Sequence, residues 1–329
     1  MSDPDEPSDT GAPKPPPSTA TEAPAAVPAA SESREEPPLV RDETASARED
    51  APAPHADAPA PAPAAAPSPG PARRGRILAI ANQKGGVGKT TTTINLGATL
   101  AEDGRRVLAV DFDPQGALSA GLGVQTHDVP TIYDLLLSRG IAPADAIQPT
   151  GVENLDVIPA NIDLSAAEVQ LVGEVAREQT LARVLTPAMS DYDVIIIDCQ
   201  PSLGLLTINA LTAAHGVIVP LACEYFALRG VALLKDTIDK VSTRLNPRLR
   251  IVGVLGTMYD GRTLHGREVL QTLVDGWTDT VFHTVIRRTV KFSDSTVAGE
   301  PILSYASSSA GAMAYRQLAR EVWARCHAE

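Results

Sequence analysis

Short apolar runs alternate with longer amphipathic stretches along most of this chain. Apolar residues dominate 76–82, 106–113, 155–160, 192–199, 216–222 and 250–260. Runs of this kind are typical of strands that are buried on both faces of a sheet. The stretches between them have the periodicity of amphipathic helices, at 91–103, 166–185, 228–245, 266–277 and 314–326. This alternation predicts the α/β class, with a mainly parallel twisted sheet flanked by helices on both faces.

The first 72 residues lack this pattern and consist mostly of Pro, Ala, Ser and acidic residues. Residues 1–70 contain four Lys or Arg and thirteen Asp or Glu, so they carry −9 of the chain's net charge of −12. A segment with so few large apolar side chains cannot offset the entropy that is lost on folding. We therefore expect residues 1–72 to form a disordered, Pro/Ala-rich acidic tail and residues 73–329 to form one domain.

Composition excludes several classes of protein. No run of about 18 apolar residues occurs, so we expect no integral membrane segment. The start of the chain lacks the basic and then apolar pattern of a secretory signal. The three cysteines, Cys199, Cys223 and Cys326, form no CxxC pair, which argues against a zinc or iron–sulfur site. These features favour a cytoplasmic protein.

A glycine-rich segment, "NQKGGVGKTT" at 82–91, lies between the first apolar run and the first helical stretch. Glycines let backbone N–H groups approach phosphate oxygens, and the start of a helix attracts anions. In a phosphate-binding loop of this kind, Lys89 contacts the β- and γ-phosphates, Thr90 binds Mg²⁺ and Thr91 reaches the α-phosphate. The sequence thus predicts ATP and Mg²⁺ as cofactors. The nucleotide-binding residues that the loop pattern predicts are Gly85, Gly86, Val87, Gly88, Lys89, Thr90 and Thr91.

Acidic residues follow two of the predicted strands. Asp111 and Asp113 end the run at 106–113, and Asp198 ends the run at 192–199. A carboxylate after four apolar residues is the Walker B pattern, which predicts that Asp198 binds Mg²⁺ through water. A carboxylate in the place of Asp113 can orient the attacking water, and Asp111 is expected nearer the metal and the loop threonine.

The loop departs from the common phosphate-loop pattern, because Gln83 stands where a glycine is usual and a second lysine, Lys84, precedes the glycines. In this form the sequence resembles the ParA/Soj family, within the MinD–ParA group of deviant Walker A ATPases. The resemblance extends over most of residues 76–325. It implies a P-loop ATPase domain at 73–329 in which two subunits enclose two ATP molecules. Lys84 would then reach the nucleotide of the partner subunit, while Lys89 serves its own.

The resemblance also implies roles for other residues. It assigns water positioning to Asp113, so that Lys84, Lys89 and Asp113 are the expected catalytic residues, and it puts Asn209 near the nucleotide. Two late segments, 257–269 and 285–302, are similar to family segments whose basic residues bind the DNA backbone without sequence specificity. The matching positions are Arg262, Arg288 and Lys291.

The function that this resemblance implies is DNA segregation. An ATP-dependent homodimer would bind double-stranded DNA non-specifically, and a ParB-like protein would stimulate its slow ATP hydrolysis. The protein would then be cytoplasmic and associated with the nucleoid. The alternative is a MinD-like ATPase that regulates cell division or positions cargo at a membrane surface. That alternative requires an amphipathic membrane anchor, and the sequence ending "EVWARCHAE" shows no separate apolar face.

Overall fold

The computed structural model of the protein describes residues 75–137, 140–224 and 227–327. The predicted tail at 1–72 lies outside the described residues, so its disorder and the domain boundary at residue 73 stay predictions. None of the helices among the described residues is long and apolar enough to cross a membrane.

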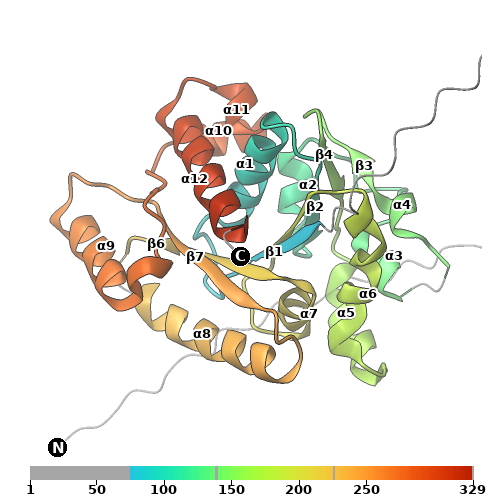
Figure 1. Ribbon diagram of the computed structural model, residues 1–329. Coiled ribbons are helices and arrows are strands. Elements are labelled where there is room, and N and C mark those ends of the chain that lie inside the picture. Colours follow the sequence, from blue (N-terminus) through green and yellow to red (C-terminus); the bar gives the residue numbers. More distant parts are fainter. Residues whose placement is uncertain (1–74, 138–139, 225–226, 328–329) are drawn as a thin grey trace, which may run out of the picture. The chain divides into compact units, whose positions relative to one another are not determined.

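A seven-stranded sheet lies at the centre of the described part, in the order β3-β4-β2-β5-β1-β6-β7 (Figure 1). Neighbouring strands are parallel, except that β3 runs antiparallel to β4. The predicted α/β class with a mainly parallel sheet is therefore confirmed. The strands are β1 (Arg76–Ile80), β2 (Val107–Phe112), β3 (Gln148–Pro149), β4 (Leu155–Ile158), β5 (Val194–Cys199), β6 (Gly216–Ala222) and β7 (Arg250–Thr257).

The central strands are apolar at nearly every position because both of their faces are covered. In β5, Ile195 and Ile197 belong to one hydrophobic core, whereas Val194 and Ile196 belong to a second core on the opposite face. Alternate side chains of a strand point to opposite faces, so a continuous apolar run fills both cores at once.

Helices cover both faces of the sheet, with α1 and α12 on one side and α7 and α8 on the other (Figure 1). The helices are α1 (Lys89–Glu102), α2 (Ala117–Gly121), α3 (Ile132–Leu137), α4 (Pro143–Ala146), α5 (Leu164–Gln170), α6 (Thr180–Leu185), α7 (Leu205–Ala213), α8 (Ala227–Arg244), α9 (Leu264–Trp277), α10 (Lys291–Val297), α11 (Ile302–Tyr305) and α12 (Ala310–His327). The 3₁₀ turns are η1 (Leu171–Gly173), η2 (Arg177–Gln179), η3 (Pro187–Ser190) and η4 (Thr278–Thr280).

One predicted helical stretch, 166–185, is divided in the structure. It forms α5, the turns η1 and η2, and α6, and Ala176 between the two turns has a positive φ of 54°. A non-glycine residue in the left-handed region interrupts a right-handed helix. Leu171 and Leu181 are buried on either side of this break. The helical spacing of apolar residues continued across it and concealed it.

Candidate nucleotide-binding site

The glycine-rich loop connects the carboxyl end of β1 to the start of α1. Gly86 and Gly88 have positive φ values of 71° and 87°. Glycine adopts such values readily because it has no Cβ. The hydroxyl of Thr257, at the end of β7, donates a hydrogen bond to the Val87 carbonyl at 2.8 Å. The loop is therefore held against the sheet by a residue that lies 170 positions later in the chain.

Lys89, the first residue of α1, is almost fully buried, with an exposed fraction of 6 %. Its Nζ donates to the carbonyl oxygen of Lys84 at 3.3 Å, so the Lys89 side chain reaches back across the loop to its first lysine. Burial lowers the pKa of Lys89, while the nearby charges of Asp198, Cys199 and Asp113 oppose that shift. The site thus holds a desolvated amine where a phosphate-binding loop requires a lysine.

Asp198, at the end of β5, is bound by two hydroxyl groups of α1. Thr90 donates to its Oδ2 at 2.7 Å, and Thr93 donates to its Oδ1 at 3.3 Å. Thr93 lies four residues after Lys89 on the same helix, so its hydroxyl faces the same side as the loop. The pairing of the P-loop threonine with the Walker B carboxylate is the arrangement that binds Mg²⁺ in P-loop proteins.

Burial, together with the neighbouring carboxylates Asp111 and Asp113, raises the pKa of Asp198 to about 8. Asp198 is fully buried, and its Thr90 and Lys89 contacts only partly offset that effect. A buried carboxylate beside other carboxylates is stabilised when a divalent cation binds. No group of three or more His, Cys, Asp or Glu in the described ranges could hold a metal alone. The donors here fit a Mg²⁺ that takes its other ligands from phosphate and water.

Asp111 is Asp198's neighbour across strands β2 and β5, but its carboxylate has different partners. Its Oδ2 accepts hydrogen bonds from the Ser119 backbone N–H at 2.9 Å and from the Ser119 hydroxyl at 2.7 Å. Burial raises the pKa of Asp111 to about 6 against the effect of these bonds. Its Oδ1 accepts from the backbone N–H of Asp113 at 3.3 Å. The structure therefore brings Asp111 next to Asp198, but Thr90 donates to Asp198 and not to Asp111.

Asp113 follows β2 and is partly exposed at the same edge of the sheet. Its Oδ1 accepts a hydrogen bond from the backbone N–H of Gln115 at 3.0 Å. Its charge lies close enough to Lys89 and Asp198 to influence the pKa of both groups. The structure thus brings Asp113 near Lys89 and Asp198, and the backbone holds one of its carboxylate oxygens.

Lys84 has an acidic partner within its own chain. Its Nζ lies 3.2 Å from Oε2 of Glu224, and the two side chains are 41 % and 54 % exposed. Its backbone N–H donates to Oδ1 of Asn82 at 3.0 Å. An exposed ion pair of this kind contributes little to stability and is readily exchanged for another partner.

Asn209 lies on α7, away from the glycine-rich loop. It is fully buried on α7, where its Nδ2 donates to the Leu205 carbonyl at 3.0 Å and its Oδ1 accepts from the Leu181 backbone N–H at 3.2 Å. Both ends of the amide are therefore occupied in the contact between α6 and α7. Asn209 thus links two helices within this chain, and its expected place near the nucleotide of the dimer stays a prediction.

The structure brings the two late basic segments together. Tyr259 donates its backbone N–H to the Ile286 carbonyl at 3.1 Å, and Arg288 donates its backbone N–H to the Tyr259 carbonyl at 3.2 Å. Arg262, Arg288 and Lys291 are all exposed on these segments. Arg262 also contacts Asp260 at 3.2 Å.

A cavity of about 750 Å³ lies beside the loop and reaches the second of these segments. Gly88 and Thr91 line one side of it, and Arg287 and Thr289 line another. Arg288 is exposed on the surface and also lines this cavity. A cavity of this size next to a phosphate-binding loop can hold the rest of a nucleotide.

Several residues of the site had no signal in the local sequence pattern. The contacts of Thr93, Thr257, Ser119 and Glu224 all depend on partners that come from other elements. Only Thr93 could have been found, because it lies at helical spacing from Lys89. The others require knowledge of which strand ends meet at this edge of the sheet.

Comparison with known proteins places these features among ATPases. A family model described as an AAA domain matches residues 75–251. The sporulation initiation inhibitor protein Soj of Bacillus subtilis is 51 % identical over 249 residues, which are 75 % of this chain and 98 % of that protein. The chromosome partitioning protein ParA of Caulobacter vibrioides is 49 % identical over 255 residues, which are 76 % of this chain and 94 % of that protein.

A solved structure matches to the same extent. The crystal structure of a Mycobacterium smegmatis protein named cobyrinic acid a,c-diamide synthase, with bound ADP and magnesium, is 44 % identical. It superposes with a TM-score of 0.68 over 77 % of this chain and 95 % of that one. A relative with this degree of identity thus holds a nucleotide and magnesium.

Proposed function

This chain belongs to the ParA/Soj family of P-loop ATPases, and we propose that it is a DNA-segregation ATPase. ATP and Mg²⁺ bind at the glycine-rich loop and drive the formation of a homodimer. The dimer binds double-stranded DNA without sequence specificity, and a ParB-like partner stimulates its slow hydrolysis of ATP. On this proposal the protein is cytoplasmic and associated with the nucleoid.

The observation that carries the proposal is the meeting of buried Lys89 and Asp198 with half-buried Thr90 at the loop. Thr90 and, through water, Asp198 are the residues that would hold Mg²⁺. The ion would neutralise charge on the transferring phosphoryl group. Lys89 would contact the β- and γ-phosphates, for which it would leave the carbonyl of Lys84. Asp113, whose carboxylate keeps one oxygen free of the Gln115 contact, would orient the attacking water.

Lys84 supports the dimer part of the proposal. Its ion pair with Glu224 is exposed, so moving the lysine to a nucleotide of the partner subunit breaks only a weak contact. Fixed positive charge from the partner would then stabilise the charge that develops in the transition state. ATP would complete the interface because its phosphates carry the negative charge that Lys84 of the other subunit contacts.

Lys84→Ala tests this step by size-exclusion chromatography with ATP and Mg²⁺. We expect the variant to bind ATP and to remain a monomer, whereas Asp113→Ala should bind ATP and accumulate as a dimer. The matched control is Lys240→Ala, which removes an exposed lysine from the surface of α8. Normal dimerisation of Lys84→Ala would contradict the cross-subunit role.

DNA binding is tested by a salt titration of the ATP-bound protein. Arg262→Ala with Lys291→Ala removes two exposed cations that do not line the nucleotide-side cavity. Each lost phosphate contact should reduce the slope of log affinity against log salt by roughly one unit per site. An unchanged slope and affinity would favour the MinD-like alternative. ATP hydrolysis that depended on cobyrinic acid and an amide donor would instead favour the activity named for the M. smegmatis protein.

A further inference from the structure

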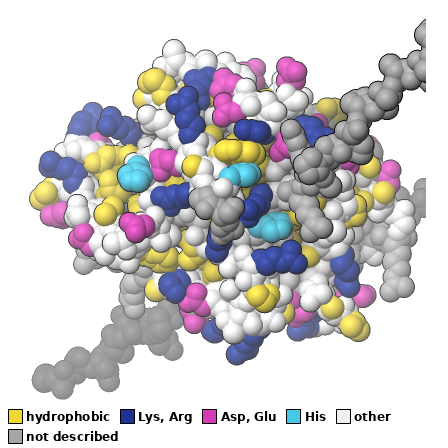
Figure 2. Space-filling view, viewed as in Figure 1, with side chains coloured by type: hydrophobic (Ala, Val, Ile, Leu, Met, Phe, Trp, Pro, Cys, Tyr) yellow, Lys and Arg dark blue, Asp and Glu magenta, His cyan; other side chains and the backbone are white. Residues whose placement is uncertain are grey.

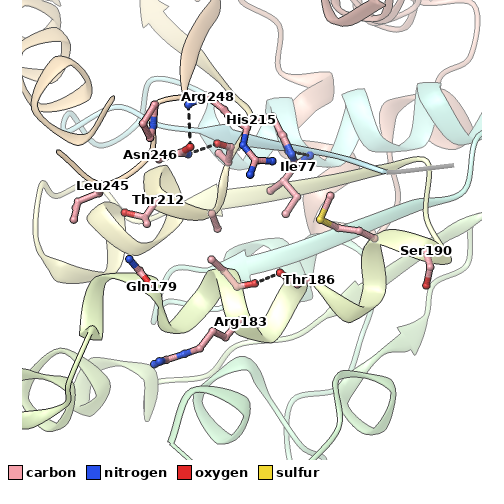
Figure 3. A pocket seen from close by; sticks show the side chains of 15 residues that line it. Ile77, Gln179, Arg183, Thr186, Ser190, Thr212, His215, Leu245, Asn246 and Arg248 are labelled. Carbon is pink, nitrogen blue, oxygen red and sulfur yellow. Dashed lines mark hydrogen bonds between the residues drawn. The ribbon is translucent and has the colours of Figure 1, made fainter. Parts of the chain in front are cut away.

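A second cavity, of about 620 Å³, opens at the edge of the sheet opposite to the glycine-rich loop. It lies where strands begin. Ile77 is near the start of β1, His215 directly precedes β6, and Arg248 lies shortly before β7. The opposite wall is formed by α6 and the turn that follows it, with Arg183 and Thr186 (Figure 3). This place is distinct from the nucleotide-side cavity, and none of the site residues described above lines it.

The lining of this cavity is cationic. Arg183 and Arg248 line it from opposite walls, and no Asp or Glu is among the described residues that line it. On the face of the domain that Figure 2 shows, basic and acidic side chains are interspersed. Arg183 donates to the Thr180 hydroxyl at 3.2 Å, and neither arginine pairs with a carboxylate of the described ranges. Two unpaired guanidinium groups around one cavity attract an anion.

His215 adds a neutral donor to the same cavity. Its Nδ1 accepts a hydrogen bond from the backbone N–H of Ile77 at 3.0 Å, so the proton of the neutral ring is on Nε2. Burial lowers the pKa of His215, and the nearby charges of Arg76 and Arg248 lower it further. The ring therefore stays neutral at pH 7 and presents an N–H donor rather than a third charge.

The floor of the cavity is apolar. Two threonine hydroxyls of the lining already donate to main-chain carbonyls, Thr186 to Ala182 at 2.6 Å and Thr212 to Ile208 at 2.7 Å. Apolar side chains fill much of the remaining lining: Ile77, Ala182, Met189, Ala213, Ala214 and Leu245. A volume of this size is typical of sites that bind small molecules through an apolar body and a few polar groups.

We propose that this cavity is a second ligand site, which binds a small organic anion. Arg183, Arg248 and the Nε2–H of His215 hold its phosphate or carboxylate group, and the apolar floor holds its body. The ligand is not the nucleotide of the glycine-rich loop, since the two sites lie at opposite edges of the sheet. The proposal does not depend on the proposed function, because it uses none of the residues that bind ATP.

The test uses the full chain and three probes in calorimetric titrations. Phenyl phosphate supplies an anionic group and an apolar body, benzoate replaces the phosphate by a carboxylate, and inorganic phosphate lacks the body. We expect phenyl phosphate or benzoate to bind with a dissociation constant of about 1 mM or tighter. Inorganic phosphate should bind at least about tenfold more weakly. The stronger of the two organic probes identifies the anionic group that the site takes.

Variants locate the binding. Arg183→Ala with Arg248→Ala should weaken the organic probe about tenfold or more, since it removes both charged donors. Arg244→Ala, at the exposed end of α8 and outside the cavity, is the matched control and should leave the affinity within about twofold. Lys89→Ala should also keep the binding. The proposal is overturned if no organic probe binds, if the double variant binds as well as the wild type, or if Lys89→Ala alone abolishes binding.

Discussion

The two edges of the sheet use polar side chains in different ways. At the carboxyl edge, the ionisable groups Lys89 and Asp198 are buried. Burial lowers the pKa of Lys89 and raises the pKa of Asp198, so it favours the neutral form of each. At the amino edge, polar side chains bind main-chain groups. Asn246 donates to the carbonyls of Leu211 and Ala214, at 3.1 and 2.6 Å. Arg325 donates to three carbonyls near the start of β7 and in the segment after α9.

This difference separates polar groups that serve a ligand from those that serve the fold. Hydrogen bonds to main-chain carbonyls satisfy groups that would otherwise be buried without partners, so they stabilise the folded chain. Buried charges without full compensation destabilise it, and they persist where a ligand supplies the missing charge. Substitutions of the buried charged groups at the carboxyl edge should therefore remove activity and spare stability. Substitutions of the side chains that bind main-chain carbonyls at the amino edge should do the reverse.

The largest effect is expected for Lys89→Ala. Removing the cation that meets the phosphates should reduce ATP turnover by about 10²–10³-fold. The free energy of unfolding without nucleotide should not fall, because burial already disfavours the charged lysine. Turnover and urea unfolding measure the two effects. Lys240→Ala, whose lysine pairs with exposed Asp236 at 2.6 Å, should change neither. A large loss of stability in Lys89→Ala would contradict the proposal that Lys89 serves the ligand and not the fold.

Arg325→Ala should have the opposite profile. The guanidinium donates to the carbonyls of Val252, Thr280 and Val281 at 2.8–3.0 Å and lies 4.3 Å from the ring centre of Phe282. Leaving these carbonyls without a charged donor should lower the free energy of unfolding by about 2–4 kcal/mol. Turnover of the folded variant should stay within about twofold. Arg320→Ala, exposed on the same helix, is the control. A turnover defect in Arg325→Ala at temperatures where it is folded would contradict the comparison.

The sequence could predict the elements of this comparison better than their contacts. The six longer strands follow from apolar runs, and the loop follows from its glycines between β1 and α1. These are local properties, which the residues of one segment determine. Strand β3 was missed, because two residues, Gln148 and Pro149, carry no period and pair only through contact with β4. The division of 166–185 was missed because helical spacing continued across the break.

The site itself was predictable only in part, for the same reason. Lys89, Thr90 and Asp198 meet as expected, since strand ends of a parallel sheet share one edge. The helix of Asn209 was predicted, but its period could not tell which neighbour the amide would meet, and that neighbour is α6. Likewise, the pairing of Lys84 with Glu224 joins residues 140 positions apart. Contacts of such separation are set by the topology of the whole domain.

A smaller effect on stability is expected for Asp198→Asn in the absence of nucleotide and Mg²⁺. Burial raises the pKa of Asp198 from 3.8 to about 8, so the folded chain keeps a proton that the unfolded chain releases. The favourable contribution of the protonated group is complete below about pH 4 and is lost as the pH rises through about 8. The variant should therefore gain stability relative to the wild type between pH 4 and pH 8. Urea unfolding in a metal chelator at pH 5 and pH 8 measures this gain.

The same titration carries its own check. Adding Mg²⁺ and ATP should stabilise the wild type more than Asp198→Asn, because only the wild type offers a carboxylate to the ion. A difference between the two proteins that is independent of pH, with or without Mg²⁺, would show that Asp198 is already ionised in the free protein.

The smallest effect is expected for Ser119→Ala, which decides the role of Asp111. The Ser119 hydroxyl donates to Oδ2 of Asp111 at 2.7 Å, and the backbone N–H of Ser119 keeps a second bond at 2.9 Å. The hydroxyl also accepts a hydrogen bond from the Ala160 backbone N–H at 3.2 Å, so the variant loses two bonds. Their loss should lower the free energy of unfolding by about 1–2 kcal/mol. If Asp111 only holds α2 to β2, turnover should stay within about threefold at every Mg²⁺ concentration.

Titrating Mg²⁺ in the turnover assay separates this result from a metal-binding role. Without the Ser119 hydroxyl, the Asp111 carboxylate has fewer partners and a pKa that rises further, because that bond lowers it. A ligand of Mg²⁺ altered in this way would raise the Mg²⁺ concentration needed for half-maximal turnover, whereas a structural brace would not. Ser165→Ala, on the exposed side of α5, is the control and should match the wild type in both measurements. A clear shift in the Mg²⁺ requirement would return Asp111 to the metal site and assign all three carboxylates of the carboxyl edge to the nucleotide reaction.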